Sequence, residues 1–130
     1  MSPRLKTGEI IKKYRVQFFA LRPVRSQAVG ETVYFNARGF KHLVFKGKHR
    51  RPSVAIVNRL VLIPLVAPTI RNCDEVVETR IRKEIIDGKK VQVTYQALEA
   101  HVGKDSIKVK VVVRKVGTRG KYFFYSIMKY

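Results

Sequence analysis

From Asp74 to its last residue, the sequence consists of strand-like runs separated by turn signals. The runs are DEVVETRIRKEIID, VQVTYQALEAHV, SIKVKVVVRKV and YFFYSIMKY, and the separating segments are DGKK, GKDS and GTRG. β-Branched and aromatic residues that alternate with polar residues between Gly- and Asp-containing turns are typical of hairpin-connected strands. This half of the chain therefore predicts a meander of four antiparallel strands.

The first half of the chain has helical spacing instead. Apolar residues recur at three- and four-residue steps at Ile10, Ile11, Tyr14, Phe18 and Leu21. This spacing predicts an amphipathic helix over residues 8–21 that stops before Pro23. An extended piece, TVYFN, is followed by a short helix within GFKHLVFK and by a helix over residues 53–62, after which Pro64 and Pro68 mark a tight connection. Helices followed by strands predict an α+β domain, with N-terminal helices packed on one face of a C-terminal four-stranded antiparallel sheet.

Alternation within each run also predicts which side chains share a face of the sheet. The predicted core face carries Ile107, Val109, Val111, Val113, Val91, Val93, Tyr95, Ala97, Phe123, Tyr125 and Ile127. The opposite face carries Lys108, Lys110, Arg114, Thr94, Gln96, Ser126 and Tyr122. A bulge or a one-residue slip would reverse a strand's faces. Cations beside aromatic rings suit the phosphates and unstacked bases of single-stranded nucleic acid, although Lys108 and Lys110 also fit the solvated face of an ordinary half-covered sheet.

The charge of the chain points to a polyanionic partner. Its 130 residues, about one domain's length, contain 28 Lys and Arg against 9 Asp and Glu, a net charge of +19. Such a charge destabilises a compact fold by self-repulsion unless a polyanion is near, so nucleic acid is the expected partner. Cys73 is the single cysteine, which fits a reducing compartment. The longest apolar candidate for a membrane span, Leu60 to Pro68, is short and interrupted by Pro64, so no span is expected. The predicted location is cytoplasmic.

The distribution of carboxylates bears on the chemistry. No Asp or Glu lies between Glu31 and Asp74 or after Asp105, which argues against a two-metal nuclease and predicts that neither a metal nor a cofactor is needed. RNA can be cut without metal, because its own 2′-hydroxyl attacks the adjacent phosphate. A histidine can move the protons, and Lys or Arg can hold the phosphate.

The segment GFKHLVFKGKHRRPS, residues 39–53, combines two of the three histidines with five cations and no acid. His42 falls inside the predicted short helix, where it is either functional or simply a capping or half-buried residue. His49 lies in a polar run and is expected to belong to the phosphate-guiding surface. His101 lies at a strand end and most simply occupies a turn without a role.

The order VYFNARGFKHL, VNRLVLIPLVAPTI and VKVVVRKVGTRGKYFFYSIMKY resembles the phage and mobile-element members of the barnase/EndoU/colicin/RelE-like nuclease superfamily. The resemblance covers residues 31–130, which leaves residues 1–30 as an N-terminal helical extension of a single nuclease-like domain. It implies a small α+β RNase that needs no metal, often a toxin or effector acting on RNA of the translation apparatus. A toxin would be accompanied by an acidic antitoxin or immunity protein.

The resemblance also implies residue roles. His42 would be the catalytic histidine, Ser126 the polar residue of the last strand in the cleft, and Arg114 or Lys115 the cation that stabilises the phosphate. His49 or Lys46 could substitute for His42, and Tyr122 for Ser126. The residues predicted to bind RNA are Lys41, Lys46, Lys48, His49, Arg50, Arg51, Thr94, Lys108, Lys110, Lys115, Lys121 and Tyr122.

Three functional hypotheses follow from the sequence. The first is a metal-independent endoribonuclease that cleaves tRNA, rRNA or mRNA. The second is a non-catalytic RNA- or DNA-binding protein that uses the same basic face. The third is a small ribosome-associated protein. All three account for the charge, so charge does not separate them.

Overall fold

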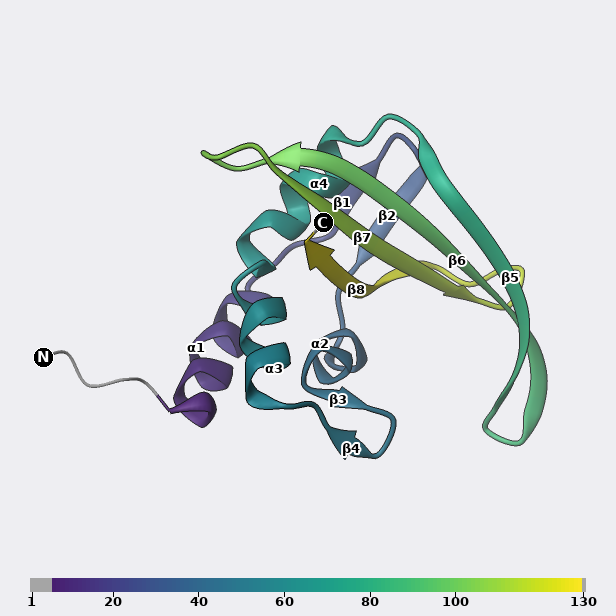
Figure 1. Ribbon diagram of the computed structural model, residues 1–130. Coiled ribbons are helices and arrows are strands. Elements are labelled where there is room, and N and C mark those ends of the chain that lie inside the picture. Colours follow the sequence, from purple (N-terminus) through teal and green to yellow (C-terminus); the bar gives the residue numbers. More distant parts are fainter. Residues whose placement is uncertain (1–5, 130) are drawn as a thin grey trace, which may run out of the picture.

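The computed structural model describes residues 6–129 and contains one mixed, twisted sheet in the order β1-β2-β8-β7-β6-β5 (Figure 1). Its strands are β1 Val24–Ser26, β2 Glu31–Tyr34, β5 Val76–Ile86, β6 Lys89–Val102, β7 Ile107–Val116 and β8 Tyr122–Lys129. A second, two-stranded sheet consists of β3 Phe45–Lys46 and β4 His49–Arg50. β2 runs parallel to β8, and the other paired strands are antiparallel.

The predicted α+β class is confirmed, but the predicted four-stranded antiparallel sheet is wrong. β5 to β8 form the expected antiparallel meander, and β1 and β2 extend it to six strands. The parallel pairing of β2 with β8 joins segments that are far apart in the sequence, so no local pattern shows it. β1 is only three residues long, within a stretch whose composition is that of a loop.

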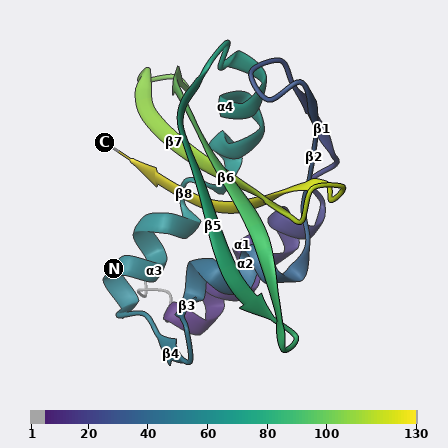
Figure 2. The ribbon, with the colours of Figure 1, turned by 90° about the vertical axis from the view of Figure 1, so that its right-hand side faces the viewer.

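The helices gather on one side of the sheet (Figures 1 and 2). They are α1 Thr7–Phe19, α2 Ala37–Val44, α3 Ser53–Leu60, the short 3-10 turn η1 Ile63–Leu65 and α4 Val66–Asn72. The predicted helix over residues 8–21, the one around GFKHLVFK and the one starting at Ser53 are confirmed to within a few residues. Pro68 does not end a helix as expected: it lies in the first turn of α4, where its missing N–H leaves no intrahelical bond unmade.

Segment 53–72 is also more apolar than expected. The 20-residue segment contains an 18-residue window with a mean hydropathy of 1.8, so by length and composition alone it could cross a membrane, and the expectation of no such segment was wrong on this criterion. In the structure η1 separates α3 from α4, and Ile56, Leu60, Ile63 and Ile70 are fully buried or nearly so. These side chains belong to the same core cluster as the sheet, as expected for a core segment of a folded domain.

The long β5–β6 hairpin reaches beyond the helices that cover the sheet (Figures 1 and 2). Its turn residues Asp87 and Gly88 both have positive φ, 51° and 76°. Two such residues form the type I′ turn whose twist matches the flanking strands, which is why the Asp-Gly signal predicted this hairpin correctly. Glu84 of β5 and Tyr95 of β6 line the same cavity as residues of α2.

The register corrects the predicted faces of β6. Leu98 pairs with Val111 and Ala100 with Val109, so these residues form the core face. Tyr95 pairs with Arg114, and Ala97 with Val112, on the opposite face. We call this opposite face, away from α4, the outer face of the sheet; its residues include Glu78, Arg80, Arg82, Tyr95, Ala97, Lys110, Val112 and Arg114.

A β-bulge corrects the predicted faces of β8. The pairing of β7 with β8 shifts between Val112 and Val113, which leaves Tyr125 as an extra residue. Tyr122 and Phe124 are therefore buried, whereas Tyr125 points to the outer face, the reverse of the prediction. Tyr122 and Thr94 are only 4% and 7% exposed, so neither presents the RNA-binding surface predicted for it.

Candidate active site

The candidate site lies along the part of β8 that is not paired with β2. β2 pairs with β8 only at Tyr122 and Phe123, and α2 packs against β8 beyond them. Gly39 of α2 packs so closely that a Cβ added there would lie 2.7 Å from the carbonyl oxygen of Phe124. Arg59 of α3 donates from Nη1 to Ser126 Oγ at 3.1 Å and to the Ile127 carbonyl at 3.4 Å. Side chains from the helices thus reach around this edge to the outer face.

α2 holds His42 at the edge. Asn36 caps the helix, because its Oδ1 accepts a hydrogen bond from the Gly39 N–H at 3.1 Å. Phe40, Leu43 and Val44 are buried and anchor the opposite side of the helix. His42 lies between Phe40 and Leu43 in the sequence, but its side chain is only half-buried. Its carbonyl accepts a hydrogen bond from Arg51 Nε at 3.2 Å.

Aromatic rings connect His42 to the sheet. The imidazole is stacked on the Tyr125 ring, with centroids 4.2 Å apart. Tyr125 in turn meets Tyr95 edge-on at 5.2 Å. The guanidinium of Arg114 lies 5.7 Å from the centre of the Tyr125 ring and 5.8 Å from that of Tyr95, within the range of cation–π attraction. Histidine and arginine are therefore held around the same two rings.

Arg114 is a largely buried cation whose positive charge is only partly compensated by a nearby carboxylate. Its side chain is 12% exposed, and its Nη2 lies 3.7 Å from Glu84 Oε1. Its buried Nε has no hydrogen-bond partner among residues 6–129. The other oxygen of Glu84 accepts the Tyr95 hydroxyl at 2.5 Å, and burial together with this bond raises the pKa of Tyr95 to about 12. Buried cations with free donor capacity bind anions strongly, so Arg114 is suited to a phosphate.

These groups surround a cavity of about 480 Å³ between α2 and β3 on one side and the sheet on the other. Its lining residues are Arg38, Lys41, His42, Phe45, Lys46, Gly47, Glu84, Tyr95, Arg114 and Tyr125. Four of these side chains are cationic at neutral pH and one is a carboxylate. The cavity is therefore positively charged, with a histidine in its wall.

The environment of His42 favours its neutral form. Burial first, and then the charges of Arg51, Arg59 and Arg114, lower its pKa from 6.5 to about 4. Near neutral pH the ring is therefore unprotonated and can accept a proton. A bound phosphate would oppose the effect of the three arginines and favour the imidazolium that forms after proton transfer.

The structure brings together some of the predicted residues. His42, Arg114, Lys41 and Lys46 line one cavity. Lys121 lines an adjoining cavity of about 210 Å³ that shares Arg38, Arg114 and Tyr125. The predicted residues on or beside the neighbouring β3–β4 hairpin are Lys48, His49, Arg50 and Arg51.

Other predicted residues lie apart from this cavity. Ser126 is 5% exposed, and its hydroxyl accepts the bond from Arg59 instead of lining the cavity. Lys115 lies with its amine 5.0 Å from the Tyr122 ring, on the core side of the sheet. Lys108 and Lys110 lie along the outer face, where they pair with Glu99 at 3.5 Å and Glu78 at 3.7 Å.

Sequence reasoning missed five residues of the site or its support: Arg38, Arg59, Glu84, Tyr95 and Tyr125. The two tyrosines were assigned to the core because each lies on an alternating apolar pattern. The acidic and basic residues carry no local signal, since their role depends on which strands and helices meet.

Comparisons with protein-family models, with curated proteins and with solved structures return no match to this chain. The nuclease-like resemblance of its sequence therefore stays a hypothesis. Within residues 6–129, no three His, Cys, Asp or Glu side chains are placed to share a metal ion.

Proposed function

We propose that this chain is a metal-independent endoribonuclease that cleaves RNA by attack of a 2′-hydroxyl on the adjacent phosphate. The observation that carries the proposal is the placement of an unprotonated histidine, His42, beside the desolvated guanidinium of Arg114 in a cationic cavity. The reaction needs a proton acceptor and a phosphate-binding cation in one cavity, and His42 and Arg114 line the same one.

In the proposed reaction His42 accepts the proton of the 2′-hydroxyl as the new oxygen–phosphorus bond forms. Arg114 stabilises the negative charge on the pentacoordinate phosphorus, because its guanidinium is already in place and poorly compensated. The 5′-oxygen leaves with a proton from an ammonium group of the same cavity, Lys41 or Lys46. The products are a 2′,3′-cyclic phosphate and a 5′-hydroxyl.

Ser126 has a supporting part in this scheme. Its hydroxyl and the Ile127 carbonyl hold Arg59, whose charge contributes to the low pKa of His42. Ser126 therefore acts as a positioning residue and not as a group that touches the scissile phosphate.

The biological setting is part of the proposal. A nuclease of this kind would act on tRNA, rRNA or mRNA in the cytoplasm as a toxin or effector of the barnase/EndoU/colicin/RelE-like superfamily. Its charge of +19 would suit an acidic antitoxin or immunity protein as inhibitor. Induced expression should then arrest growth of a host cell, and His42→Ala should relieve the arrest.

The direct test is cleavage of labelled RNA by purified protein in excess EDTA. The wild-type protein should cleave, and His42→Ala should lose about 10²-fold or more of the rate while binding RNA with similar affinity. Equal rates for wild type and His42→Ala would overturn the role of His42. Tight binding without cleavage of any RNA would favour the non-catalytic RNA-binding alternative.

A further inference from the structure

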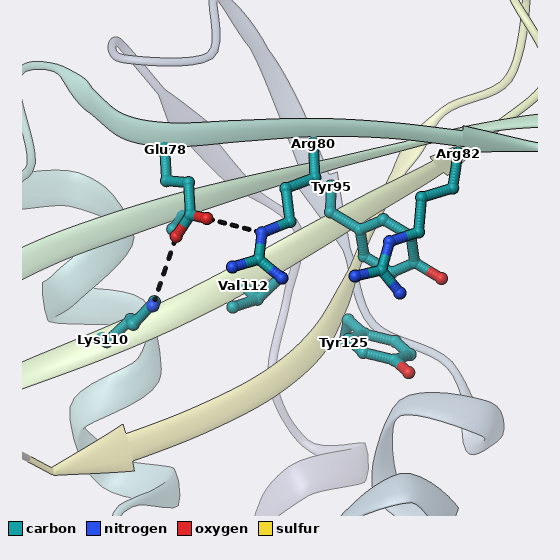
Figure 3. A pocket seen from close by; sticks show the side chains of 8 residues that line it. Glu78, Arg80, Arg82, Tyr95, Lys110, Val112 and Tyr125 are labelled. Carbon is teal, nitrogen blue, oxygen red and sulfur yellow. Dashed lines mark hydrogen bonds and ion pairs between the residues drawn. The ribbon is translucent and has the colours of Figure 1, made fainter.

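A second cavity, of about 250 Å³, lies on the outer face of the sheet (Figure 3). It is lined by Glu78, Arg80, Arg82, Tyr95, Ala97, Lys110, Val112 and Tyr125. Tyr95 and Tyr125 line both cavities, so the two spaces adjoin along these rings. A ligand bound beside His42 therefore lies next to the second cavity.

The lining of the second cavity divides into a cationic part and an apolar part. Arg80 and Arg82 extend from β5, and Lys110 extends from β7 (Figure 3). The small side chains of Ala97 and Val112 leave room between them, and the tyrosine rings offer flat surfaces. Guanidinium groups suit a phosphate, and a flat ring suits an unstacked base.

Glu78 is the acidic residue in the lining of this cavity, and it pairs with two of the cations there. Its carboxylate accepts a bond from Arg80 Nε at 2.5 Å and lies 3.7 Å from Lys110 Nζ. Figure 3 places Glu78 at the end away from Tyr125, whereas Arg82 lies near the tyrosines. A phosphate of the same RNA strand that enters from the His42 cavity would therefore meet Arg82 before it meets the Glu78 carboxylate.

We infer that the second cavity is a subsite for one nucleotide of single-stranded RNA adjacent to the scissile phosphate. The inference rests on the proposed function, because it takes the position of that phosphate from the His42 cavity. Its substrate class is single-stranded RNA, since bases paired in an A-form helix cannot turn their faces to the tyrosine rings. Arg82 is the phosphate-binding residue of the subsite.

The chain provides a matched control for Arg82. Lys83 is its neighbour on β5, and successive side chains of a strand point to opposite faces. Arg82→Ala and Lys83→Ala therefore remove the same charge from the same strand, but only Arg82→Ala removes it from the cavity. Both side chains are exposed, so both variants are expected to fold, which thermal melting checks.

The experiment measures fluorescence anisotropy of 2′-O-methyl RNA, which cannot be cleaved by the proposed route, in single-stranded and duplex form. Arg82→Ala should weaken binding of the single strand about 5- to 10-fold, a typical loss for one charge-assisted contact, and Lys83→Ala less than about 2-fold. Arg82→Lys should recover part of the loss. The duplex should respond equally weakly to both alanine variants.

Equal losses for Arg82→Ala and Lys83→Ala, or equal losses on single strand and duplex, would overturn the subsite in favour of a diffuse electrostatic field. Because this readout needs no cleavage, it is separate from the test of the proposed function. Selective loss in Arg82→Ala without any nuclease activity in the wild type would support the nucleotide-binding cavity and overturn the nuclease. If the wild type cleaves RNA but Arg82→Ala and Lys83→Ala bind it equally well, the nuclease is supported and the nucleotide subsite is overturned.

Discussion

The imidazole of His42 is stacked on the phenol ring of Tyr125, with ring centres 4.2 Å apart and planes inclined by 25°. The contact joins α2 to the bulged residue of β8. Two features make it possible: the open edge of β8 beyond Phe123, and Gly39, which lets α2 approach that edge. The position of the proposed base therefore depends on a ring that belongs to the sheet.

Replacement of Tyr125 should show this dependence. Tyr125→Ala removes the surface on which His42 rests and exposes the imidazole, so its pKa should rise from about 4 toward 6.5. Cleavage should fall about 10- to 100-fold, because small displacements of a catalytic group are costly. NMR titration of His42 and the rate of RNA cleavage measure the two effects.

Tyr125→Phe is the matched control, since it keeps the ring and removes only the hydroxyl. It should retain the low pKa of His42 and most of the activity. If the alanine and phenylalanine variants lose activity alike, the hydroxyl takes part in the reaction and stacking is not what matters.

The pH dependence of cleavage should reflect the low pKa of His42. The base must be unprotonated, so kcat/KM should decline only as the pH falls through about 4, well below the ordinary histidine value. A lower limb centred near pH 6.5 would contradict the proposed environment of the ring.

Stability should follow the same titration. Because the pKa of His42 is lowered on folding, the unfolded chain binds more protons between about pH 4 and 6.5, and the free energy of unfolding should rise with pH across this window. His42→Asn should make the rise shallower. Urea unfolding of both proteins at the two ends of the window measures the difference. An identical change in the free energy of unfolding between the two pH values would count against the shifted pKa.

Gly39→Ala should separate α2 from β8. The added Cβ would lie 2.7 Å from the Phe124 carbonyl oxygen, too close without a backbone shift, and such overpacking typically costs about 1–3 kcal/mol. Activity should fall as well, because His42 moves with the helix. Thermal unfolding and cleavage rates provide the measurements.

Gly8→Ala is the control for this substitution. Gly8 lies in α1, and a Cβ there meets no atom within 4 Å. It should be neutral or stabilise the protein by up to about 1 kcal/mol through helix propensity. A Gly39→Ala protein as stable and active as Gly8→Ala would show that the close approach is not required.

The Tyr95–Glu84 hydrogen bond should keep Glu84 from fully compensating Arg114. Tyr95→Phe removes the 2.5 Å bond and should cost about 1 kcal/mol of stability. The released carboxylate should then pair more closely with Arg114 and weaken RNA binding. A double-mutant cycle with Glu84→Gln measures the coupling, and additive effects of the two changes would argue against the link.

The sequence alone predicted the elements with strong local signals. α1 follows from helical spacing, and the β5–β6 hairpin from alternation around Asp87 and Gly88. His42 and Arg114 were selected through the resemblance to a nuclease superfamily, and the fold places both on one cavity.

What the sequence did not predict depends on contacts between distant segments. The parallel pairing of β2 with β8 leaves no local pattern, and the bulge in β8 shifts Tyr125 from the predicted core to the outer face. Tyr122, which was predicted on the face opposite the core, is buried for the same reason. Arg59 could not be recognised, because its partner Ser126 lies 67 residues further along the chain.

The most direct test of the proposed chemistry is mass spectrometry of the RNA ends produced in excess EDTA. An oligonucleotide cut by the wild-type protein should yield a 2′,3′-cyclic phosphate and a 5′-hydroxyl, and a single 2′-deoxy substitution at the cleaved nucleotide should abolish the cut. Products with 5′-phosphate ends, or cleavage that persists at the 2′-deoxy position, would contradict attack by the 2′-hydroxyl.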